Sequence, residues 1–290
     1  MMVVVEQCPF LFIALNIKLK HMGSKYKMDL AICIAVKNRS NLVVYQEDPI
    51  ETYKHIADKI QGTPSDSHFP PTLNRDATIT LNLLPKLLMS LRMIKTGNDN
   101  WTVIIVDYES TDVNVASIAN QILDGHIRCV VEKHEGQFSR GSGLHLAAEI
   151  ARKRGHDTLF FCDADMYFTH HYIFDRAAES IKENKVYYPI CFSFTQPDHM
   201  KGYWRDSGYG MMFISSEKYF GTERWQHNVS WGEEDNAMRR NFSEAEVIRG
   251  KAIGYFHQWH PNSIVFKTLE YPVKHYAGRA AVQKTENSLN

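Results

Sequence analysis

Two aspartates, Asp163 and Asp165, lie one residue apart directly after the apolar run Thr158–Cys162. Side chains at positions i and i+2 of a strand end point to the same side. The two carboxylates can therefore hold a hard divalent cation together with a sugar or ribose hydroxyl. Such a cation stabilises the charge that grows on a nucleoside diphosphate as it leaves a sugar. The alternative, two solvated acids, is disfavoured because apolar residues flank the pair on both sides.

A second group of acids follows an aromatic residue in the run Trp231-Gly232-Glu233-Glu234-Asp235. A sugar hydroxyl is a weak nucleophile, and a positioned carboxylate can accept its proton as it attacks. Trp231 and Gly232 suit a face on which a sugar ring stacks. The alternative is a plain helix start, since acids are favourable at a helix N-terminus.

Two histidines, His257 and His260, follow the apolar run Ala252–Tyr255. A histidine at a strand end can complete a metal shell that Asp165 begins. Mixed carboxylate, imidazole and phosphate-oxygen ligands suit Mn²⁺, with Mg²⁺ as the alternative ion. A surface histidine pair beside a buried Trp259 would explain the same pattern without a metal.

Two further polar groups lie next to predicted elements. Asp107 ends the apolar run Trp101–Val106 and can accept a hydrogen bond from a uracil N–H or a ribose hydroxyl, although an ordinary capped turn is an equal alternative. Arg140 lies in the run Phe138–Gly143, which is best explained as a helix start. A contact between Arg140 and a donor diphosphate is the alternative, because the run lacks the lysine of a phosphate-binding loop.

The elements that must position these residues alternate between strand and helix at a spacing of about 30 residues, which is typical of a parallel sheet covered by helices. Strands are predicted at 29–36, 101–106, 127–131 and 158–162, and helices at 84–94, 114–123 and 143–154. In such sheets ligands bind beyond the carboxyl ends of the strands. Three polar groups follow strands in this way: Lys37 to Arg39, Asp107, and the Asp163–Asp165 pair.

The rest of the chain has less regular patterns. Residues 46–76 are polar and predict an irregular insertion with one short helix. The second half is rich in aromatic residues and predicts a mixed sheet that supplies the acceptor side. We therefore expect an α/β fold in which residues 29–290 form a single domain, divided into a nucleotide-binding half (29–165) and an acceptor half (166–275).

Composition excludes several classes of protein. The chain has 290 residues, of which 44% are hydrophobic, enough for a sizeable core. Lysine plus arginine equals aspartate plus glutamate at 33 each, which argues against a nucleic-acid partner. The five cysteines form no CxxC motif, so neither a zinc ribbon nor a disulfide framework is indicated.

The N-terminus predicts a leader or extension over residues 1–27. Its apolar run Cys8–Ile17 is shorter than the ~20 residues needed to span a bilayer. No basic segment precedes this run and no small-residue cleavage site follows it, so it does not resemble a signal peptide. The resulting expectation is a soluble cytoplasmic protein without a membrane span. The oligomeric state stays open.

Seven motifs occur in one order that resembles the GT-A glycosyltransferases, and in particular the family of chondroitin synthases, chondroitin N-acetylgalactosaminyltransferases and β-1,4-galactosyltransferases. The motifs are VKNRSNL (36–42), VIIVDYESTD (103–112), FSRGSGLHLA (138–147), FFCDADMYFT (160–169), YWRDSGYGMMFIS (203–215), WGEEDNAM (231–238) and YFHQWH (255–260). Together they cover roughly residues 29–262. Their shared order is far more specific than any one motif.

The resemblance implies a GT-A fold, a UDP-sugar donor, a glycan acceptor, Mn²⁺ and inversion at the anomeric carbon. It assigns metal binding to Asp165 and His257, with a weaker claim for His260, and the role of catalytic base to Asp235 beside Glu234. It assigns donor binding to Lys37, Arg39, Asp107, Arg140, Asp163, Ala164 and Asp165. The acceptor or sugar contacts are Trp204, Trp231 and Gly232.

Some features depart from this family. Glu233 stands where WGGED is common, so the donor sugar stays open among GalNAc, GlcNAc, galactose, glucuronic acid and xylose. The membrane anchor typical of the animal Golgi enzymes is not evident, which leads to the expectation of a bacterial or viral relative. Two other functions compete: a glycoside hydrolase that pairs Asp163 or Asp165 with Asp235, and a non-catalytic sugar-binding relative.

Overall fold

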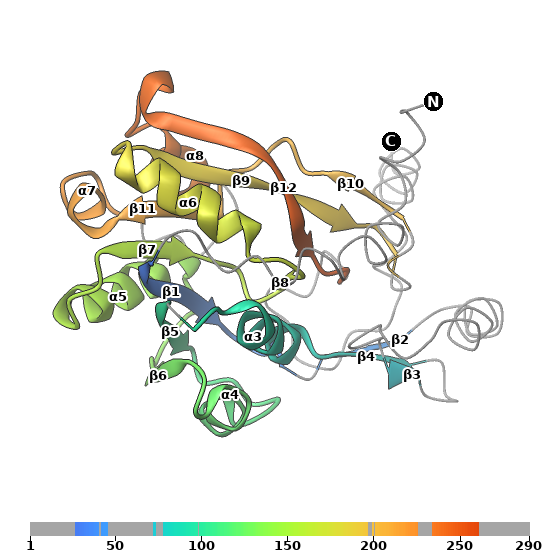
Figure 1. Cartoon of the computed structure of the whole chain (residues 1–290). Coiled ribbons are helices and arrows are strands. Elements are labelled where there is room, and N and C mark those ends of the chain that lie inside the picture. Colours follow the sequence, from blue (N-terminus) through green and yellow to red (C-terminus); the bar gives the residue numbers. More distant parts are fainter. Residues whose placement is uncertain are drawn as a thin grey trace, which may run out of the picture.

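The computed structural model describes residues 27–40, 42–45, 72–73, 78–97, 99–196, 199, 201–225 and 234–260 (Figure 1). These residues form one large mixed sheet with helices on both faces and a separate three-stranded sheet. In the large sheet the strand order is β6-β5-β1-β7-β11-β9-β12-β8, and β10 pairs with β9. The predicted α/β fold is therefore confirmed, including its mixed second half.

The first half of the large sheet is parallel. It consists of β1 (Asp29–Val36), β5 (Asn100–Asp107), β6 (Arg128–Lys133) and β7 (Thr158–Phe161). The strands β1, β5 and β7 form because their apolar runs are buried, as the interior of a parallel sheet requires, whereas β6 is an edge strand and is only partly buried. The register pairs Val36 with Asp107 and Cys33 with Phe161, so the carboxyl ends of the central strands lie at one edge.

The second half is mixed. It contains β8 (Met166–Phe168), β9 (Val186–Phe194), β10 (Gly202–Trp204), β11 (Met212–Ser215) and β12 (Val247–His257). β11 runs antiparallel to β7 with Met212 opposite Phe161, so the chain that enters β11 passes close to Asp163. β12 runs antiparallel to β8 with His257 opposite Met166, which brings His257 next to Asp165. The register of two strand pairs thus assembles most of the candidate site.

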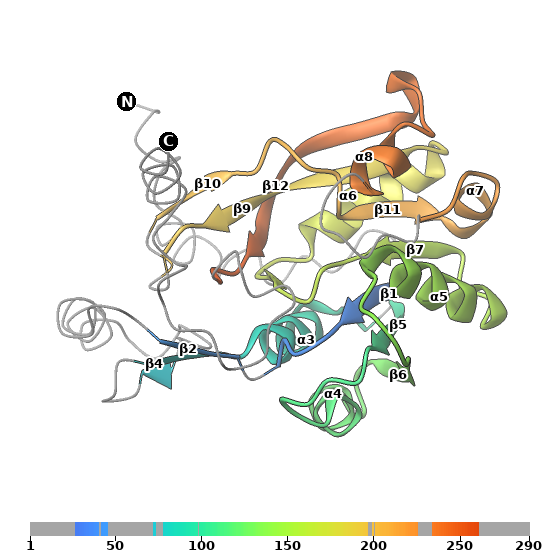
Figure 2. The same cartoon turned by 180° about the vertical axis from the view of Figure 1, so that it is seen from behind.

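Helices cover both faces of this sheet. One apolar cluster joins the sheet to α3 (Leu83–Ile94), α4 (Val115–Leu123) and α6 (Tyr172–Lys182). A second cluster joins the opposite face to α5 (Arg140–Lys153), α7 (Ser216–Phe220) and α8 (Glu234–Arg239). Figure 2 shows α5 and α8 in front of the sheet, while α6 lies in front in the opposite view of Figure 1.

The helix that Arg140 begins approaches the sheet very closely. Ser139 caps it, and its hydroxyl accepts a hydrogen bond from the backbone N–H of Ser142. A Cβ added at Gly143 would lie 2.6 Å from the Cβ of Ala35 and 3.0 Å from the ring of Tyr108. Gly143 of the Gly-Ser-Gly run therefore serves helix–strand packing, in agreement with a helix start rather than a phosphate loop.

The small sheet was not predicted from the sequence. It has the order β2-β4-β3, formed by β2 (Leu42–Tyr45), β3 (Thr72–Leu73) and β4 (Thr78–Leu81). The short helix expected within 46–76 falls almost entirely outside the described residues. Four cysteines of the described chain, Cys33, Cys129, Cys162 and Cys191, are free thiols. All but the half-buried Cys129 are buried, as expected for small apolar residues.

Candidate active site

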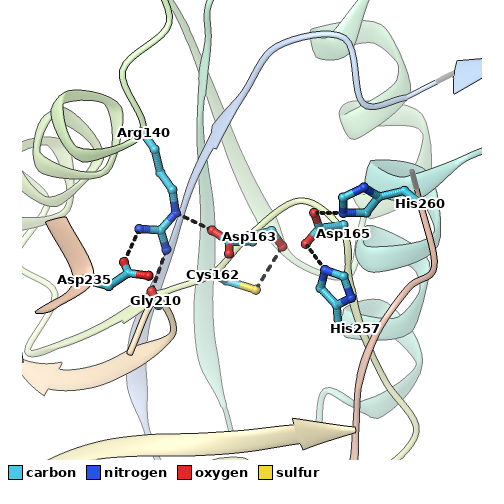
Figure 3. Close-up of polar contacts among 8 residues, drawn as sticks. All are labelled: Arg140, Cys162, Asp163, Asp165, Gly210, Asp235, His257 and His260. Atoms are coloured by element: carbon cyan, nitrogen blue, oxygen red, sulfur yellow. Dashed lines mark hydrogen bonds and ion pairs between the residues drawn. The ribbon is translucent and has the colours of Figure 1, made fainter. Parts of the chain in front are cut away.

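The two aspartates of the first motif lie in the turn between β7 and β8. The backbone N–H of Met166 donates to the carbonyl of Asp163, and the carbonyl of Asp165 accepts from the N–H of Gln258. Ala164 between them is buried. Figure 3 shows that their carboxylates point in opposite directions, each into its own cluster of side chains. The strand-end prediction that both carboxylates point to one side is therefore wrong, because the chain turns between them.

Asp163 belongs to a cluster centred on Arg140. The Arg140 Nε lies 2.6 Å from Asp163 Oδ1, and one terminal nitrogen lies 2.9 Å from Asp235 Oδ1. The other terminal nitrogen donates to the carbonyl of Gly210 at 2.6 Å. All three guanidinium nitrogens are thus engaged by the protein, and residues about 70 and 95 positions away are held together by one side chain.

Burial governs the acidity of this cluster. It raises the pKa of Asp235, and nearby Asp163 adds to that effect while Arg140 opposes it. Burial likewise raises the pKa of Glu234, whose Oε2 has no hydrogen-bond partner among the described residues. For Arg140, burial lowers the pKa but Asp163 and Asp235 raise it more strongly, so the guanidinium stays charged. A carboxylate with a raised pKa is a better proton acceptor, which suits Asp235 to general-base chemistry.

Asp165 belongs to a second cluster, with His257 and His260. The His260 Nε2 lies 3.0 Å from Asp165 Oδ2, and the His257 Nε2 lies 3.8 Å from Asp165 Oδ1. One ligand atom from each residue lies within 4.8 Å of the others, the spacing of a site that could hold a metal ion. The other His257 nitrogen, Nδ1, lies 3.1 Å from the Ser193 hydroxyl, a contact that fixes the ring orientation.

The residues of this second cluster fit a divalent cation. Asp165 Oδ1 is buried, and no hydrogen-bond donor among the described residues reaches it. Burial lowers the pKa of His257 to about 4, which keeps its imidazole neutral as a metal ligand must be. Burial alone would raise the pKa of Asp165, but its histidine neighbours and Arg39 hold that pKa well below its usual value. A carboxylate with two imidazoles suits Mn²⁺ and similar ions.

The predicted nucleoside end lies at the loops after β1 and β5. Asp107 is buried and accepts from the backbone N–H of Ser110 at 3.0 Å. Asn38, in the left-handed region with φ 52°, accepts from the N–H of Thr111 and so ties the two loops together. The carbonyl of Arg39 accepts a hydrogen bond from the backbone N–H of Leu84 at 3.0 Å. One of the Arg39 guanidinium nitrogens has no partner among the described residues. Lys37 is half-buried beside them.

The predicted acceptor residues are only partly described. Trp204 lies in β10, half-buried and edge-on to Phe192 at 5.6 Å, with the Lys251 amine 5.5 Å from its ring. No contact of Trp204 with either acid cluster is present among the described residues. Trp231, Gly232 and Glu233 lie outside the described residues. Their predicted roles stay predictions.

Two residues that contribute to the site, Gly210 and Arg205, were not predicted individually from the sequence. Gly210 has no room for a side chain, because an added Cβ would lie 2.9 Å from Asp235 Oδ2 and 3.1 Å from an Arg140 nitrogen. Arg205 carries a charge that lowers the pKa of both Asp235 and His257, so it faces the two clusters at once. Both belong to the motif YWRDSGYG, whose glycines and arginine were the available signal.

The fold and the two acid clusters define a class: glycosyltransferases of the GT-A fold that use nucleotide sugars. The model of the family described as chondroitin N-acetylgalactosaminyltransferase matches residues 98–270, which is more than half of the chain. The protein therefore belongs to this family.

Curated relatives agree with this assignment. Chondroitin sulfate N-acetylgalactosaminyltransferase 2 of Mus musculus is 31% identical over 146 residues, which is 43% of this chain and 27% of the relative. Chondroitin sulfate synthase 3 of Homo sapiens is 30% identical over 146 residues, which is 44% of this chain and 16% of the relative. The chain thus matches well under a third of the length of these relatives.

Solved structures share the fold at low sequence identity. The crystal structure of S. aureus TarS 1-349 matches with a TM-score of 0.51 and 13% identity over 80% of this chain and 60% of that chain. The same protein in complex with UDP matches with a TM-score of 0.52 and 12% identity over 81% of this chain and 61% of that chain. At this identity the likeness concerns the fold alone.

These relatives correct the expected location. The prediction of a cytoplasmic protein is wrong, because the relatives are chondroitin-synthesising enzymes of mouse and human, the Golgi membrane enzymes named above. The prediction depended on the run Cys8–Ile17, which lies outside the described residues and carries no information on location by its length alone. Within the described chain, no helix is both long enough and apolar enough to cross a membrane.

Proposed function

We propose that this protein is a metal-dependent inverting glycosyltransferase that moves a sugar from a UDP-sugar to a hydroxyl group of a glycan. One observation carries the proposal. The neighbouring acids Asp163 and Asp165 divide between two clusters, one built like a metal site and the other containing Asp235, a half-buried carboxylate suited to proton transfer. Metal-dependent inverting transfer uses a cation for the leaving group and a base for the acceptor, and the two clusters offer one site for each.

The metal would be held by Asp165 and His257, with His260 as a further ligand. When bound, a divalent cation neutralises charge on the leaving diphosphate. The protein prepares this site by keeping Asp165 ionised and by fixing the His257 ring through Ser193. Asp165 can therefore bind a cation without first losing a proton, and the His257 ring is already held in one orientation.

The base would be Asp235. Its raised pKa and its place at the start of α8 suit it to accept the proton of an acceptor hydroxyl. Arg140 bonds to both carboxylates and so holds Asp235 next to Asp163, which would contact the donor sugars. Glu234, whose Oε2 is buried and unpaired among the described residues, would bind a sugar hydroxyl of donor or acceptor. Inversion follows from a single attack on the face opposite the leaving group.

The donor would bind along the edge of the parallel sheet. Asp107, Lys37 and Arg39 would contact the nucleoside. Two observations support this: Val36 pairs with Asp107 in the register of β1 and β5, and the charge of Arg39 lowers the pKa of Asp165. UDP is the nucleotide named for the TarS complex, and N-acetylgalactosamine is the sugar named for the family. UDP-GalNAc with a chondroitin-type acceptor is therefore the first pair to test.

The experiment is a screen of UDP-sugars with Mn²⁺, with and without oligosaccharide acceptors, on the parent protein and on Asp235→Asn. We expect transfer by the parent and a loss of about 10²- to 10⁴-fold in the variant, the range for removing a general base. Asp124→Asn, an exposed aspartate at the end of α4, is the matched control and should retain full activity. Full transfer by Asp235→Asn would contradict the proposal. Release of sugar from a glycan without any nucleotide would favour a hydrolase instead.

A further inference from the structure

The segment that connects β10 to β11 is held by two arginines from opposite sides. Arg249, on β12, donates to the carbonyls of Asp206 at 2.5 Å and Gly208 at 3.0 Å. Arg140 donates to the carbonyl of Gly210 at 2.6 Å. Alternate carbonyls along residues 206–210 therefore each accept from a guanidinium. We call this segment the 206–210 loop.

The 206–210 loop touches the candidate base at one end. Gly210 lies so close to Asp235 and Arg140 that a Cβ there would collide with both. A shift of Gly210 toward Asp235 would therefore crowd the carboxylate, and a shift away would lengthen or break the hydrogen bond from Arg140. The position of the loop and the position of Asp235 are mechanically linked through this contact.

A ring in the middle of the loop makes a second link. The Arg249 guanidinium lies 4.2 Å from the Tyr209 ring centroid, and the Arg239 guanidinium lies 5.7 Å from it. Arg239 is the last residue of α8, the helix whose first turn carries Asp235. The Tyr209 ring also packs edge-on against Tyr188 at 5.3 Å. The loop thus connects β12 to both ends of the helix that carries the base.

We propose that Arg249 is a positioning residue for sugar transfer, acting on Asp235 and Arg140 through the 206–210 loop. This inference rests on the proposed function, in which Asp235 is the base. Within the described chain, the hydrogen bonds and the ring contact of the Arg249 side chain are with the 206–210 loop and not with Asp163, Asp165 or Asp235. Arg249 would therefore act through the loop. The planar guanidinium of Arg249 can donate to two carbonyls that lie two residues apart in the chain. A lysine amine cannot reproduce this geometry.

The first test compares Arg249→Ala with Arg249→Lys. The alanine variant loses both loop bonds and the ring contact, so we expect kcat for transfer to fall about ten- to hundredfold, as for other small misplacements of catalytic groups. The affinity for UDP with Mn²⁺ should stay as in the parent, because the metal cluster is on the other side of Ala164. The lysine variant should recover part of kcat. Arg154→Ala is the matched control and should behave as the parent, because Arg154 is exposed and lies at the opposite end of α5 from Arg140.

The second test asks whether Arg249 acts through Asp235. In an Asp235→Asn background the remaining slow transfer should be insensitive to Arg249→Ala, since effects on one unit are not additive. A general structural role would lower transfer by the same factor in both backgrounds, and that result would overturn the inference. So would parent-like kcat in Arg249→Ala. Full transfer by Asp235→Asn alone would instead overturn the proposed function.

Tyr209→Leu provides an independent variant if Arg249→Ala does not fold. It removes the ring between the two guanidiniums while keeping apolar volume. We expect the same pattern, with a lower kcat in the parent background, unchanged UDP affinity and no effect in the Asp235→Asn background. A loss of UDP affinity equal to the loss of kcat would contradict the inference.

Discussion

Two aspartates of this protein, the half-buried Asp165 and the buried Asp99, meet histidine rings at opposite ends of the same sheet. Asp165 follows β7 and meets His257 and His260, whereas Asp99 directly precedes β5 and meets His171. Each has one carboxylate oxygen that no described donor reaches. Composition and burial alone would not tell these two groups apart.

Their geometry differs in one respect that decides what each can do. At Asp165 two imidazoles face one carboxylate, so three ligand atoms converge within 4.8 Å. At His171 two carboxylates contact opposite nitrogens of one ring, Asp99 at 2.9 Å and Asp175 at 3.5 Å. Ligand atoms on opposite sides of a ring cannot meet at one ion. The first group is suited to bind a metal and the second to a structural ion pair.

Electrostatics separate the two groups in the same way. Burial lowers the pKa of His257 to about 4, so this ring is neutral. Burial would also lower the pKa of His171, but the hydrogen bond and charge of Asp99 raise it above its ordinary value. The His171 ring is stacked on Trp101 at 5.6 Å, which suits a cation. Two convergent imidazoles, one of them with a strongly lowered pKa, therefore indicate a ligand site. An imidazole held between two carboxylates, with a raised pKa, indicates a stabilising contact.

The largest expected effect is that of Asp165→Asn. Removing the one carboxylate of the convergent cluster should lower Mn²⁺-dependent transfer about a thousandfold, the equivalent of several kcal/mol of lost charge stabilisation. Stability in denaturant should change little. Initial rates at saturating UDP-sugar, over a range of Mn²⁺ concentrations, measure this. If Asp165→Asn kept the transfer rates of the parent, the functional distinction between Asp165 and Asp99 would be lost.

Asp99→Ala is the reciprocal change. It removes the main hydrogen-bond partner of the half-buried His171 ring, so we expect a loss of about 1–3 kcal/mol in the free energy of unfolding. Transfer at a temperature where the variant is folded should equal that of the parent. Denaturant titration and the same rate assay give both numbers. A loss of activity without a loss of stability would show that this end of the sheet also serves the reaction.

Ser193→Ala tests the support of the metal cluster. Its hydroxyl orients the His257 ring through Nδ1, and partners of this kind are worth about 10- to 100-fold in metal affinity. We expect the Mn²⁺ concentration for half-maximal transfer to rise by about tenfold, with the rate at saturating Mn²⁺ close to that of the parent. An unchanged Mn²⁺ requirement would place His257 outside the metal shell.

The smallest effect is in the pH dependence of stability. Because the folded-state pKa of His171 is raised, its contribution is present in full below the ordinary histidine pKa of about 6.5 and is lost as pH rises through the folded value. The pKa of Asp99 is lowered, so its contribution is lost only as pH falls through its folded-state value, below about 3.9. The free energy of unfolding should therefore fall less in His171→Gln than in the parent between pH 6 and pH 8. His126→Gln, an exposed histidine, should keep the parent slope.

Much of the fold could be predicted from the sequence, because its parallel half repeats one local pattern. The strand predicted at 29–36 coincides with β1, and the helix predicted at 84–94 differs from α3 by one residue at its start. The helix predicted from 143 begins earlier, at Arg140, because Ser139 rather than the glycine run caps it. The small sheet of β2, β3 and β4 was missed, since two- to four-residue strands leave no periodicity to detect.

The candidate site could be predicted as a set of residues but not as an arrangement. Strand ends identified Asp107, Asp163 and Asp165. The sequence could not show that Asp163 and Asp165 point into different clusters, because the turn at Ala164 is set by hydrogen bonds to Gln258, about 90 residues later. The sequence also could not show that Arg140 joins Asp163, Asp235 and the carbonyl of Gly210, because these partners come from other parts of the chain. The contact of Arg140 with a donor diphosphate stays a prediction.

The most direct test of the account is a calorimetric titration of UDP into the parent protein, first with Mn²⁺ and then with a chelator in its place. If Asp165, His257 and His260 hold a metal that binds the diphosphate, UDP affinity should be at least about tenfold higher with Mn²⁺, the size of a typical coupling between two ligands. Equal affinity with and without Mn²⁺ would contradict the assignment of the convergent cluster as a metal site.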